Sequence, residues 1–392
     1  MKKLIALVMI LSIMACAQKE PADLLVFNAN IYTVNDNFET AEAMVVTDGN
    51  VVAVGTTNAL KSQYNAENQY DAEGNTIVPG FYDAHCHFNG LGLSLQQVNL
   101  RGTTSYDDVI QRFVDFQKEK TLSFITGRGW DQNYWEVKKF PTKEKLDAAF
   151  PDTPVVVRRV DGHALLANTA AMKLAGVTVD SSKEGGDIII ENGELTGVFI
   201  DGPMGFFSGI APKSTLAEQI LALTDAQKTC FSYGLTTVND AGLGRHTIEL
   251  MDSLQQADEL KIRIYAMVSV SDKNIDYYTN KGIIKTDRLN VRSFKVYADG
   301  ALGSRGATMK APYADKPMHY GAMVTPVDKL QDYAKKIAAS DYQMNTHAIG
   351  DSANYVMLKT YKDVLKDQKD RRWKIEHAQI IDLTDFDYFD NV

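Results

Sequence analysis

Residues 343–377 read QMNTHAIGDSANYVMLKTYKDVLKDQKDRRWKIEH. Two short segments of strand character lie on either side of a longer segment of helical character. This pattern predicts a strand at Gln343–His347, a helix from Ser352 to about Lys366 and a second strand at Arg372–His377. A strand, a helix and another strand in this order are typical of parallel strands joined by a helical crossover. The segment therefore favours an α/β fold.

The same alternation continues towards the N-terminus as far as residue 233. The helix before it should begin after Thr215, since Glu218 follows three residues on as in a capping box, and should end before Gly234. The other expected elements are the strand 233–239, a helix near 247–260, the strand 262–270, the strand 291–298 and a helix opened by Thr325 with Pro326 at its first position. Such alternation indicates a parallel sheet, closed or open.

Two segments fall outside this alternation. Residues 22–78 are rich in strand formers and carry a two-residue hairpin signal at Asp48-Gly49. Residues 100–210 hold a Trp-rich patch and a second hairpin signal at Asn192-Gly193. We interpret the first segment as a separate β domain and the second as an insertion or cap beside the main sheet.

The composition is that of an ordinary globular protein: 392 residues, of which 45% are apolar and 23% charged. With 41 basic and 50 acidic side chains the formal charge is -9, which argues against general nucleic-acid binding. The cysteines Cys16, Cys86 and Cys230 are too few for a disulfide framework.

The first residues have the features of an export signal. Lys2 and Lys3 precede an apolar run at 4–14, which as a helix would span about 16 Å and is too short to cross a membrane comfortably. We expect residues 1–15 to be a signal peptide. The segment LSIMAC, which ends at Cys16, resembles a bacterial lipobox, so Cys16 would carry lipid and anchor the exported protein to a bacterial membrane, in the periplasm or at the cell surface. A plain signal peptide with a chance cysteine is the alternative.

Histidines stand at the ends of three predicted strands. His85 and His87 form an H-x-H pair, and strand alternation would place both rings on one face with Cys86 on the other. His347 and His377 end two later strands, and in a β/α barrel such strand ends meet over one site. Neutral imidazoles grouped in this way suit a divalent cation such as zinc. Taken singly, each histidine also fits a structural role.

Lys295 lies in the middle of the strand 291–298, on the same face as Tyr297 and Asp299. A lysine on that face would point into the barrel, where an unpaired ammonium is costly. Two alternatives follow. Lys295 could pair with Asp299, or it could lose its charge and react with carbon dioxide to give an anionic carbamate whose two oxygens can bridge cations.

Together these motifs resemble the amidohydrolase superfamily, and within it the branch of YtcJ-like and N-substituted formamide deformylase-like hydrolases. The segments that carry the resemblance are PGFYDAHCH (79–87), KVYADGALGSR (295–305), HAIGD (347–351) and IEHA (375–378), with GRGWD (127–131) and RRVDGH (158–163) in the inserted segment. The resemblance extends from about residue 22 to the end of the chain.

The resemblance implies a distorted TIM (β/α)8-type barrel at 79–392 and a small β-sandwich domain, of which 22–78 is the N-terminal part. It also implies a divalent metal, zinc in the first instance, with one or two ions bound. The implied ligands are His85 and His87 on the first strand, carboxylated Lys295 as the bridging group, and His347 and His377 on the fifth and sixth strands.

One feature of the superfamily is missing. Its general base is an aspartate at the end of strand eight, whereas only about six barrel strands are recognisable here. None of Asp382, Asp385, Asp387 and Asp390 fits the strand-eight pattern. We therefore assign no catalytic base and expect a fragment of a longer chain, with the barrel incomplete after about strand six. Loss of the base is the alternative.

Other residues beside strand ends or in the insertion are candidates for contact with a small-molecule substrate. These candidates are Trp130, His163, Asp299, Ser304 and Arg305. Loop stabilisation or core packing is the alternative role for each.

These features predict a membrane-anchored, metal-dependent amidohydrolase that cleaves a non-peptide C–N bond, in an amide, formamide or related group, with metal-activated water. An ester or phosphoester hydrolase with the same metal centre is one alternative. A catalytically inactive, ligand-binding lipoprotein is another. The substrate, the number of metal ions and the oligomeric state are left open.

Overall fold

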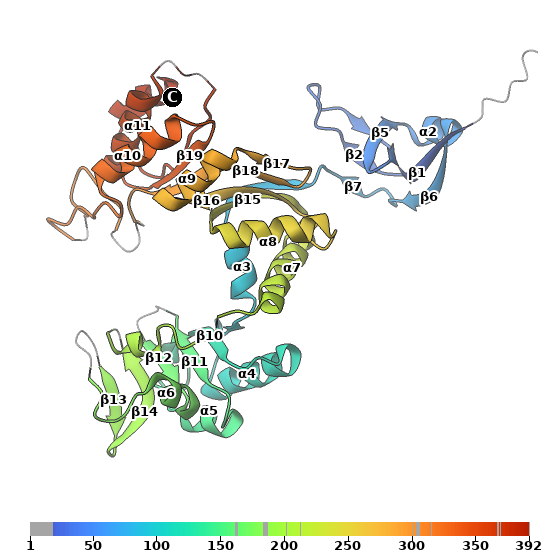
Figure 1. Cartoon of the computed structure of the whole chain (residues 1–392). Coiled ribbons are helices and arrows are strands. Elements are labelled where there is room, and N and C mark those ends of the chain that lie inside the picture. The colour runs from blue at the N-terminus through green and yellow to red at the C-terminus, as the bar shows by residue number, and fades with distance from the viewer. Residues whose placement is uncertain are drawn as a thin grey trace, which may run out of the picture. The chain divides into compact units, whose positions relative to one another are not determined.

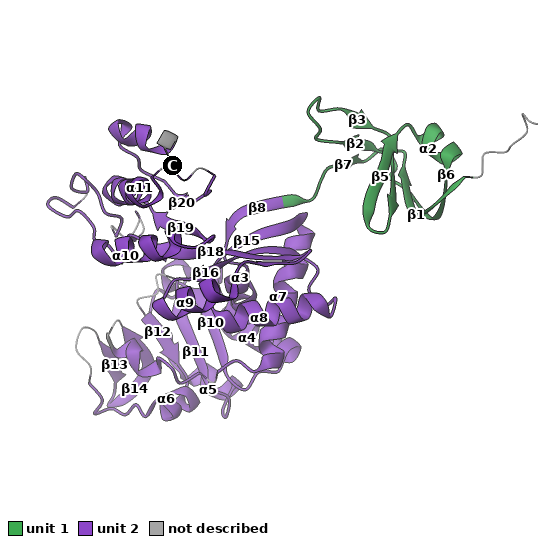
Figure 2. Ribbon diagram, turned by 45° about the horizontal axis from the view of Figure 1, so that its top comes forward, with its two compact units in different colours: residues 1–81 green, residues 82–392 purple. Residues whose placement is uncertain are grey.

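The structure is a computed structural model that describes residues 19–160, 164–182, 187–200, 202–211, 213–300, 302, 306–314, 316–366, 368 and 370–391. The chain divides into two compact units, Met1–Phe81 and Tyr82–Val392, which Figure 2 colours separately. The division lies beside the change of character expected near residue 79.

The N-terminal unit contains two small sheets and a helix. The strand orders are β5-β4-β1-β6 and β3-β2-β7. The bounds are β1 Glu20–Phe27, β2 Asn30–Tyr32, β3 Thr40–Ala41, β4 Ala43–Thr47, β5 Asn50–Gly55, α2 Thr57–Gln63, β6 Tyr64–Asp71 and β7 Thr76–Ile77. Leu25, Val45 and Leu60 pack in its core. The hairpin predicted between β4 and β5 is confirmed, because Asp48 and Gly49 both have the positive φ angles (50° and 72°) that such a turn requires.

The second unit contains the parallel sheet that the alternation predicts (Figure 1). Its strand order is β20-β19-β18-β16-β15-β8, with β17 added antiparallel to β18. The neighbours from β15 to β20 all pair in parallel, and the sheet curves into a nearly closed barrel. The strand bounds are β8 Phe81–Cys86, β15 Leu235–Leu243, β16 Arg263–Ser269, β17 Ile284–Lys285, β18 Leu289–Tyr297, β19 Gln343–Ala348 and β20 Lys374–His377.

Helices pack against this sheet and bury its apolar side chains, such as Val268, Phe294 and Met344. Their bounds are α3 Phe88–Ser94, α7 Leu216–Ser232, α8 Arg245–Gln256, α9 Asp272–Lys281, α10 Val327–Ala338, α11 Asp351–Leu365 and the 3-10 helix η3 Leu383–Asn391. The capping box of α7 is confirmed. The start expected for α10 is wrong by one residue: Pro326 has extended backbone and caps the helix, which begins at the next residue.

The insertion forms a sheet of its own, in the order β13-β14-β12-β11-β10-β9. Its bounds are β9 Val98–Asn99, α4 Tyr106–Lys120, β10 Ile125–Trp130, η1 Gln132–Tyr134, α5 Glu144–Ala149, β11 Val155–Arg159, β12 Ala164–Ala167, α6 Thr169–Ala175, β13 Ile188–Glu191, β14 Glu194–Ile200 and η2 Gly202–Phe207. The predicted hairpin at Asn192-Gly193 joins β13 to β14. Among the helices of the described residues, none combines the length and the apolar character needed to cross a membrane.

Candidate metal centre

The H-x-H pair stands at the carboxyl end of β8. His85 Nδ1 lies 2.7 Å from Glu376 Oε2 of β20, and His87 Nδ1 lies 2.9 Å from the carbonyl oxygen of Ala241 in β15. A carbonyl and a carboxylate can only accept, so Nδ1 carries a proton in both rings, and in the neutral form of each ring the lone pair is on Nε2. His85 Nε2 is buried without a hydrogen-bond partner. This tautomer, with Nδ1 held by a carboxylate or carbonyl, is the one that metal-binding histidines adopt.

His347 and His377 complete a group of four imidazoles. The ring centroids lie 5.7 Å apart for His85 and His87, 4.7 Å for His85 and His377, and 4.6 Å for His347 and His377. The four rings come from β19, β20 and the end of β8. The structure therefore brings together residues that are almost 300 positions apart in the sequence.

The backbone at the end of β20 is unusual. His377 has φ 77° and Ala378 has φ 41°, a region that non-glycine residues seldom occupy and that stores strain. Because of this turn, two consecutive side chains, Glu376 and His377, both reach His85, although consecutive side chains of a regular strand point to opposite faces.

Burial keeps three of the four rings neutral. Burial lowers the pKa of His87 and of His347. Burial, together with the neighbouring His347 and His85, lowers the pKa of His377 to about 4. At neutral pH these three rings are uncharged and have a lone pair for a cation.

Lys295 of β18 lies in the same region. It is only 1% exposed, and its Nζ has no hydrogen-bond partner and lies 5.1 Å from the centroid of the Tyr297 ring. Burial lowers the pKa of Lys295 to about 8, against the opposing effect of the Glu376 carboxylate. The neutral amine is therefore more accessible near neutral pH than that of an ordinary lysine.

The alternative in which Lys295 pairs with Asp299 is wrong. The Asp299 carboxylate is fully buried and accepts hydrogen bonds from the backbone N–H groups of Thr308, Ile349 and Gly350, at 2.8 to 2.9 Å. These bonds show that Asp299 stabilises the loops around it, and its contact with substrate stays a prediction.

The four imidazoles do not form a finished coordination shell. Within the described ranges, no three His, Cys, Asp or Glu side chains are arranged so that they could hold a metal ion as they stand. The unpartnered His85 Nε2 and Lys295 Nζ are nevertheless buried beside the other rings, and buried polar atoms of this kind are rare without a function. The four histidines and Lys295 thus have the chemical groups that bind a divalent cation, and they lie close to one another.

Of the remaining substrate candidates, Trp130 lies in the core of the insertion. It is 1% exposed, and its Nε1 donates a hydrogen bond to the carbonyl oxygen of Val157 at 3.2 Å. Trp130 therefore packs in the core of the insertion, and its contact with substrate stays a prediction. The other predicted residues lie outside the described part of the chain: Cys16, His163, Ser304 and Arg305.

The sequence analysis missed two acidic residues in the barrel. Glu376 holds His85, and Asp240 of β15 is 1% exposed beside the start of α3. Burial raises the pKa of Asp240 to about 6. The signal that could have found Glu376 is an acidic residue next to a histidine in a predicted strand, and the signal for Asp240 is its place directly after the predicted strand 233–239.

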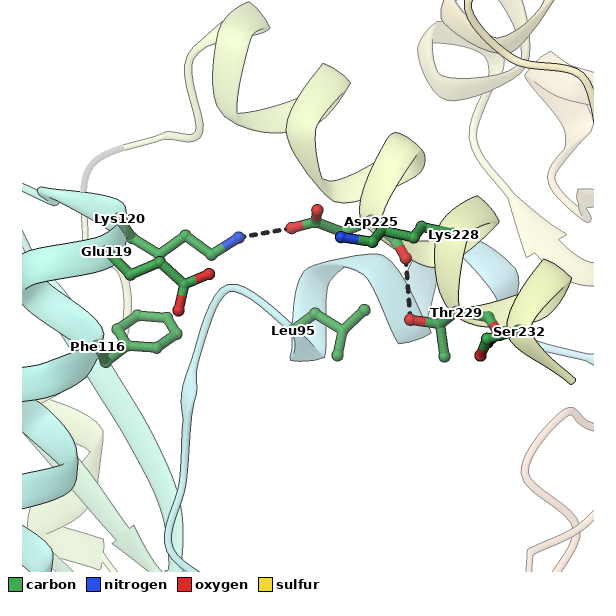
Figure 3. Close-up of a pocket in the computed structure, with 8 residues that line it drawn as sticks. All are labelled: Leu95, Phe116, Glu119, Lys120, Asp225, Lys228, Thr229 and Ser232. Carbon is green, nitrogen blue, oxygen red and sulfur yellow. Dashed lines mark hydrogen bonds and ion pairs between the residues drawn. The ribbon is translucent and has the colours of Figure 1, made fainter.

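A separate pocket lies between α4 and α7 (Figure 3), with a volume of about 360 Å³. Lys120 Nζ lies 2.6 Å from Asp225 Oδ2, and Gln96 Nε2 donates to the same oxygen at 3.1 Å. The lining residues are Leu95, Phe116, Glu119, Lys120, Asp225, Lys228, Thr229 and Ser232. No predicted ligand is among them, so this pocket is a junction between the insertion and the barrel and not part of the histidine group.

Comparison with known proteins relates this chain to hydrolases. The model of a family described as the amidohydrolase family matches residues 69–391. The chain is 33% identical over 378 residues to Protein LONG AFTER FAR-RED 3 of Arabidopsis thaliana, covering 91% of this chain and 64% of that protein. It is thus shorter than this relative by about a third. To the putative amidohydrolase YtcJ of Bacillus subtilis it is 29% identical, with coverage of 90% and 68%.

Identity to the N-substituted formamide deformylase of Arthrobacter pascens is 23%, with coverage of 91% and 69%. Among solved structures, an uncharacterized metal-dependent hydrolase of Pyrococcus horikoshii OT3 superposes with a TM-score of 0.69 at 26% identity, covering 87% of this chain and 68% of that one. This superposition confirms the predicted barrel fold.

Proposed function

This chain belongs to the amidohydrolase family, and on that premise we propose that it catalyses the hydrolysis of a non-peptide C–N bond, in an amide, a formamide or a related group. The observation that carries the proposal is the group of four imidazoles beside the buried Lys295, whose Nζ has no hydrogen-bond partner. Family membership supports a hydrolase, and the nature of the bond is our inference.

The residues proposed to hold the metal are His85, His87, Lys295, His347 and His377, and the metal proposed is zinc, as one or two ions. A bound divalent cation of this kind lowers the pKa of coordinated water towards about 7 and polarises the bond to be cleaved. Glu376 and the Ala241 carbonyl fix the tautomers of the first two rings, so that each Nε2 is free to bind.

Lys295 is proposed to be carboxylated. The neutral amine attacks the carbon of carbon dioxide, a C–N bond forms, and the nitrogen loses one proton to solvent, which leaves a carbamate with one negative charge. A pKa of about 8 makes the neutral amine accessible near neutral pH, and the absence of any partner for Nζ leaves it free to react. We assign the general base to no residue of this chain.

The proposal is tested by metal analysis and a substrate panel. His85→Ala combined with His87→Ala should abolish zinc uptake and hydrolysis, whereas His246→Ala, on the exposed start of α8, should change neither. Hydrolysis of formamides and amides in preference to esters and phosphoesters is expected, and the reverse preference would favour the rival hydrolase. Failure of the chain to bind metal after supplementation would favour the inactive lipoprotein.

Export and lipid attachment at Cys16 are also proposed, on the basis of the lipobox-like segment alone. Lipid attachment would place the site at a bacterial membrane surface. Metabolic labelling with an alkynyl fatty acid should mark the protein, and Cys16→Ser should abolish the label.

A further inference from the structure

We propose that Asp240 is a positioning residue for His87, and that it acts by holding the turn between β8 and α3 in the conformation that binds metal. This inference rests on the proposed function. Asp240 has no role among the predicted ligands, and it contacts the chain two residues after His87.

The first observation is the start of α3. His87 is the N-cap residue of this helix, and its side chain makes no capping hydrogen bond, because the ring is engaged with the Ala241 carbonyl. The backbone N–H groups of a first helical turn need another acceptor. Asp240 Oδ2 supplies one from the neighbouring strand, since it lies 2.9 Å from the backbone nitrogen of Asn89. A carboxylate at this end of a helix is also favoured by the helix dipole.

The second observation is that consecutive residues of β15 act on the same segment. The Asn239 side chain accepts a hydrogen bond from the Tyr82 hydroxyl at 2.6 Å and donates to the carbonyl oxygen of Ala84 at 3.0 Å. Asp240 then holds the start of α3, and the residue after it holds the His87 ring. Residues 239–241 therefore fix the backbone on both sides of His87 as well as its ring.

The third observation is that α3 packs closely against α7. A Cβ atom on Gly92 would lie 2.2 Å from the Ala222 carbonyl oxygen of α7, so the two helices are in close contact. With the body of α3 fixed by α7, the capping carboxylate decides where the first turn, and with it His87, comes to rest. A buried carboxylate costs more than a neutral side chain, which argues for a role beyond packing.

The test measures Co²⁺ affinity from the visible absorption of the full chain. Asp240→Ala should weaken Co²⁺ binding by about 10- to 100-fold, the range found when partners of metal ligands are removed. Asp240→Asn keeps an acceptor but loses the charge, so its loss of affinity should be smaller. Hydrogen exchange of the amides at 88–91 should be faster in Asp240→Ala than in the wild type.

The matched control is Asp147→Ala. Asp147 accepts hydrogen bonds from the backbone nitrogen and the hydroxyl of Thr169, the first residue of α6 in the insertion, at 2.6 and 2.7 Å. It is thus also a carboxylate at a helix start, and its loss should lower stability while the Co²⁺ affinity stays unchanged.

Wild-type affinity in Asp240→Ala, or equal losses in Asp240→Ala and Asp147→Ala, would overturn the inference. If Asp240→Ala does not fold, Asp240→Asn decides: affinity below the wild type supports a positioning role and wild-type affinity contradicts it. Failure of the proposed function looks different, because the wild type would then bind no Co²⁺ and His87→Ala would change nothing.

Discussion

Asn168 of the insertion and Lys295 of the barrel are both buried, at 0% and 1% exposure. The Asn168 side chain accepts hydrogen bonds from two backbone N–H groups and donates to the carbonyl oxygens of Phe150 and Thr153. Lys295 Nζ has no hydrogen-bond partner. The insertion pairs this buried polar group by hydrogen bonds within the protein, whereas the barrel contains a buried amino group without a hydrogen bond.

The barrel and the insertion also differ in their other buried polar side-chain atoms. His85 Nε2, Ser293 Oγ and both amide atoms of Asn345 are also buried without partners, and all three residues lie on barrel strands. Between residues 98 and 207, the described part contains no buried side-chain nitrogen or oxygen that lacks a partner. Each such atom costs about 1–3 kcal/mol. Their concentration in the barrel indicates that this sheet is shaped for binding and the insertion for stability.

The strongest way to sharpen this comparison is Lys295→Met. Metal uptake and hydrolysis should be lost completely, because the variant lacks the group that we propose to bridge the metal. The free energy of unfolding should stay equal or rise, since an apolar side chain of similar length replaces an unsatisfied amine. Urea denaturation and metal analysis measure the two effects. A fall in stability with metal binding retained would mean that Lys295 is structural.

The reciprocal change in the insertion is Asn168→Ala. It removes the N-cap of α6 and leaves several backbone groups unpaired, so the free energy of unfolding should fall by about 3 kcal/mol. Metal affinity should not change. Urea denaturation followed by fluorescence measures the free energy of unfolding, and a Co²⁺ titration measures the metal affinity. A loss of affinity would show that the two regions are not separable in this way.

Glu376→Gln tests the orientation of His85. The amide oxygen can still accept from Nδ1, but the charge-assisted bond is lost, and Co²⁺ affinity should fall by about 10-fold. Glu191→Gln, on the exposed hairpin of the insertion, is the control and should leave the affinity intact. Equal affinities for the two variants would remove Glu376 from the site.

The smallest effect is expected at the junction between the two regions (Figure 3). Burial alone would raise the pKa of Asp225, but the hydrogen bonds from Lys120 and Gln96 outweigh it, and the pKa is lowered. A double-mutant cycle of Lys120→Met and Asp225→Asn should give a coupling energy of at most about 1 kcal/mol. A larger coupling would mean that the insertion is part of the barrel's stability.

The sign of the pH dependence follows from the lowered pKa. The contribution of Asp225 is fully present above the unfolded pKa of about 3.9 and is lost as the pH falls through the folded value. The stability difference between the wild type and Asp225→Asn should therefore disappear under acidic conditions. A difference that persists at low pH would contradict the ion-pair explanation.

Much of the fold was predictable because its signals are local. The capping box at Thr215, the turn at Asp48-Gly49 and the strand that carries Lys295 depend only on neighbouring residues. Helix α9 was missed, since only Ile275 and Tyr278 are buried in it and its apolar pattern is weak. The clustering of the histidines was predictable because parallel strands end at the same edge of a sheet.

The role of Glu376 was not predictable in the same way. Strand alternation assigns Glu376 and His377 to opposite faces, and the positive φ of His377 breaks that rule. Asp299 was proposed as a substrate contact because it follows a strand end and Trp130 because it lies in the insertion, whereas backbone N–H groups and the insertion core engage them. Tertiary partners of this kind leave no local pattern in the sequence.

The most direct test is an anomalous difference map from crystals of the chain grown with zinc and recorded at the zinc absorption edge. The account predicts a peak at coordination distance from His85, His87, His347 and His377, with density for a carboxylated side chain at Lys295 beside it. A map with no peak among these residues, or with its peaks elsewhere on the protein, would contradict it.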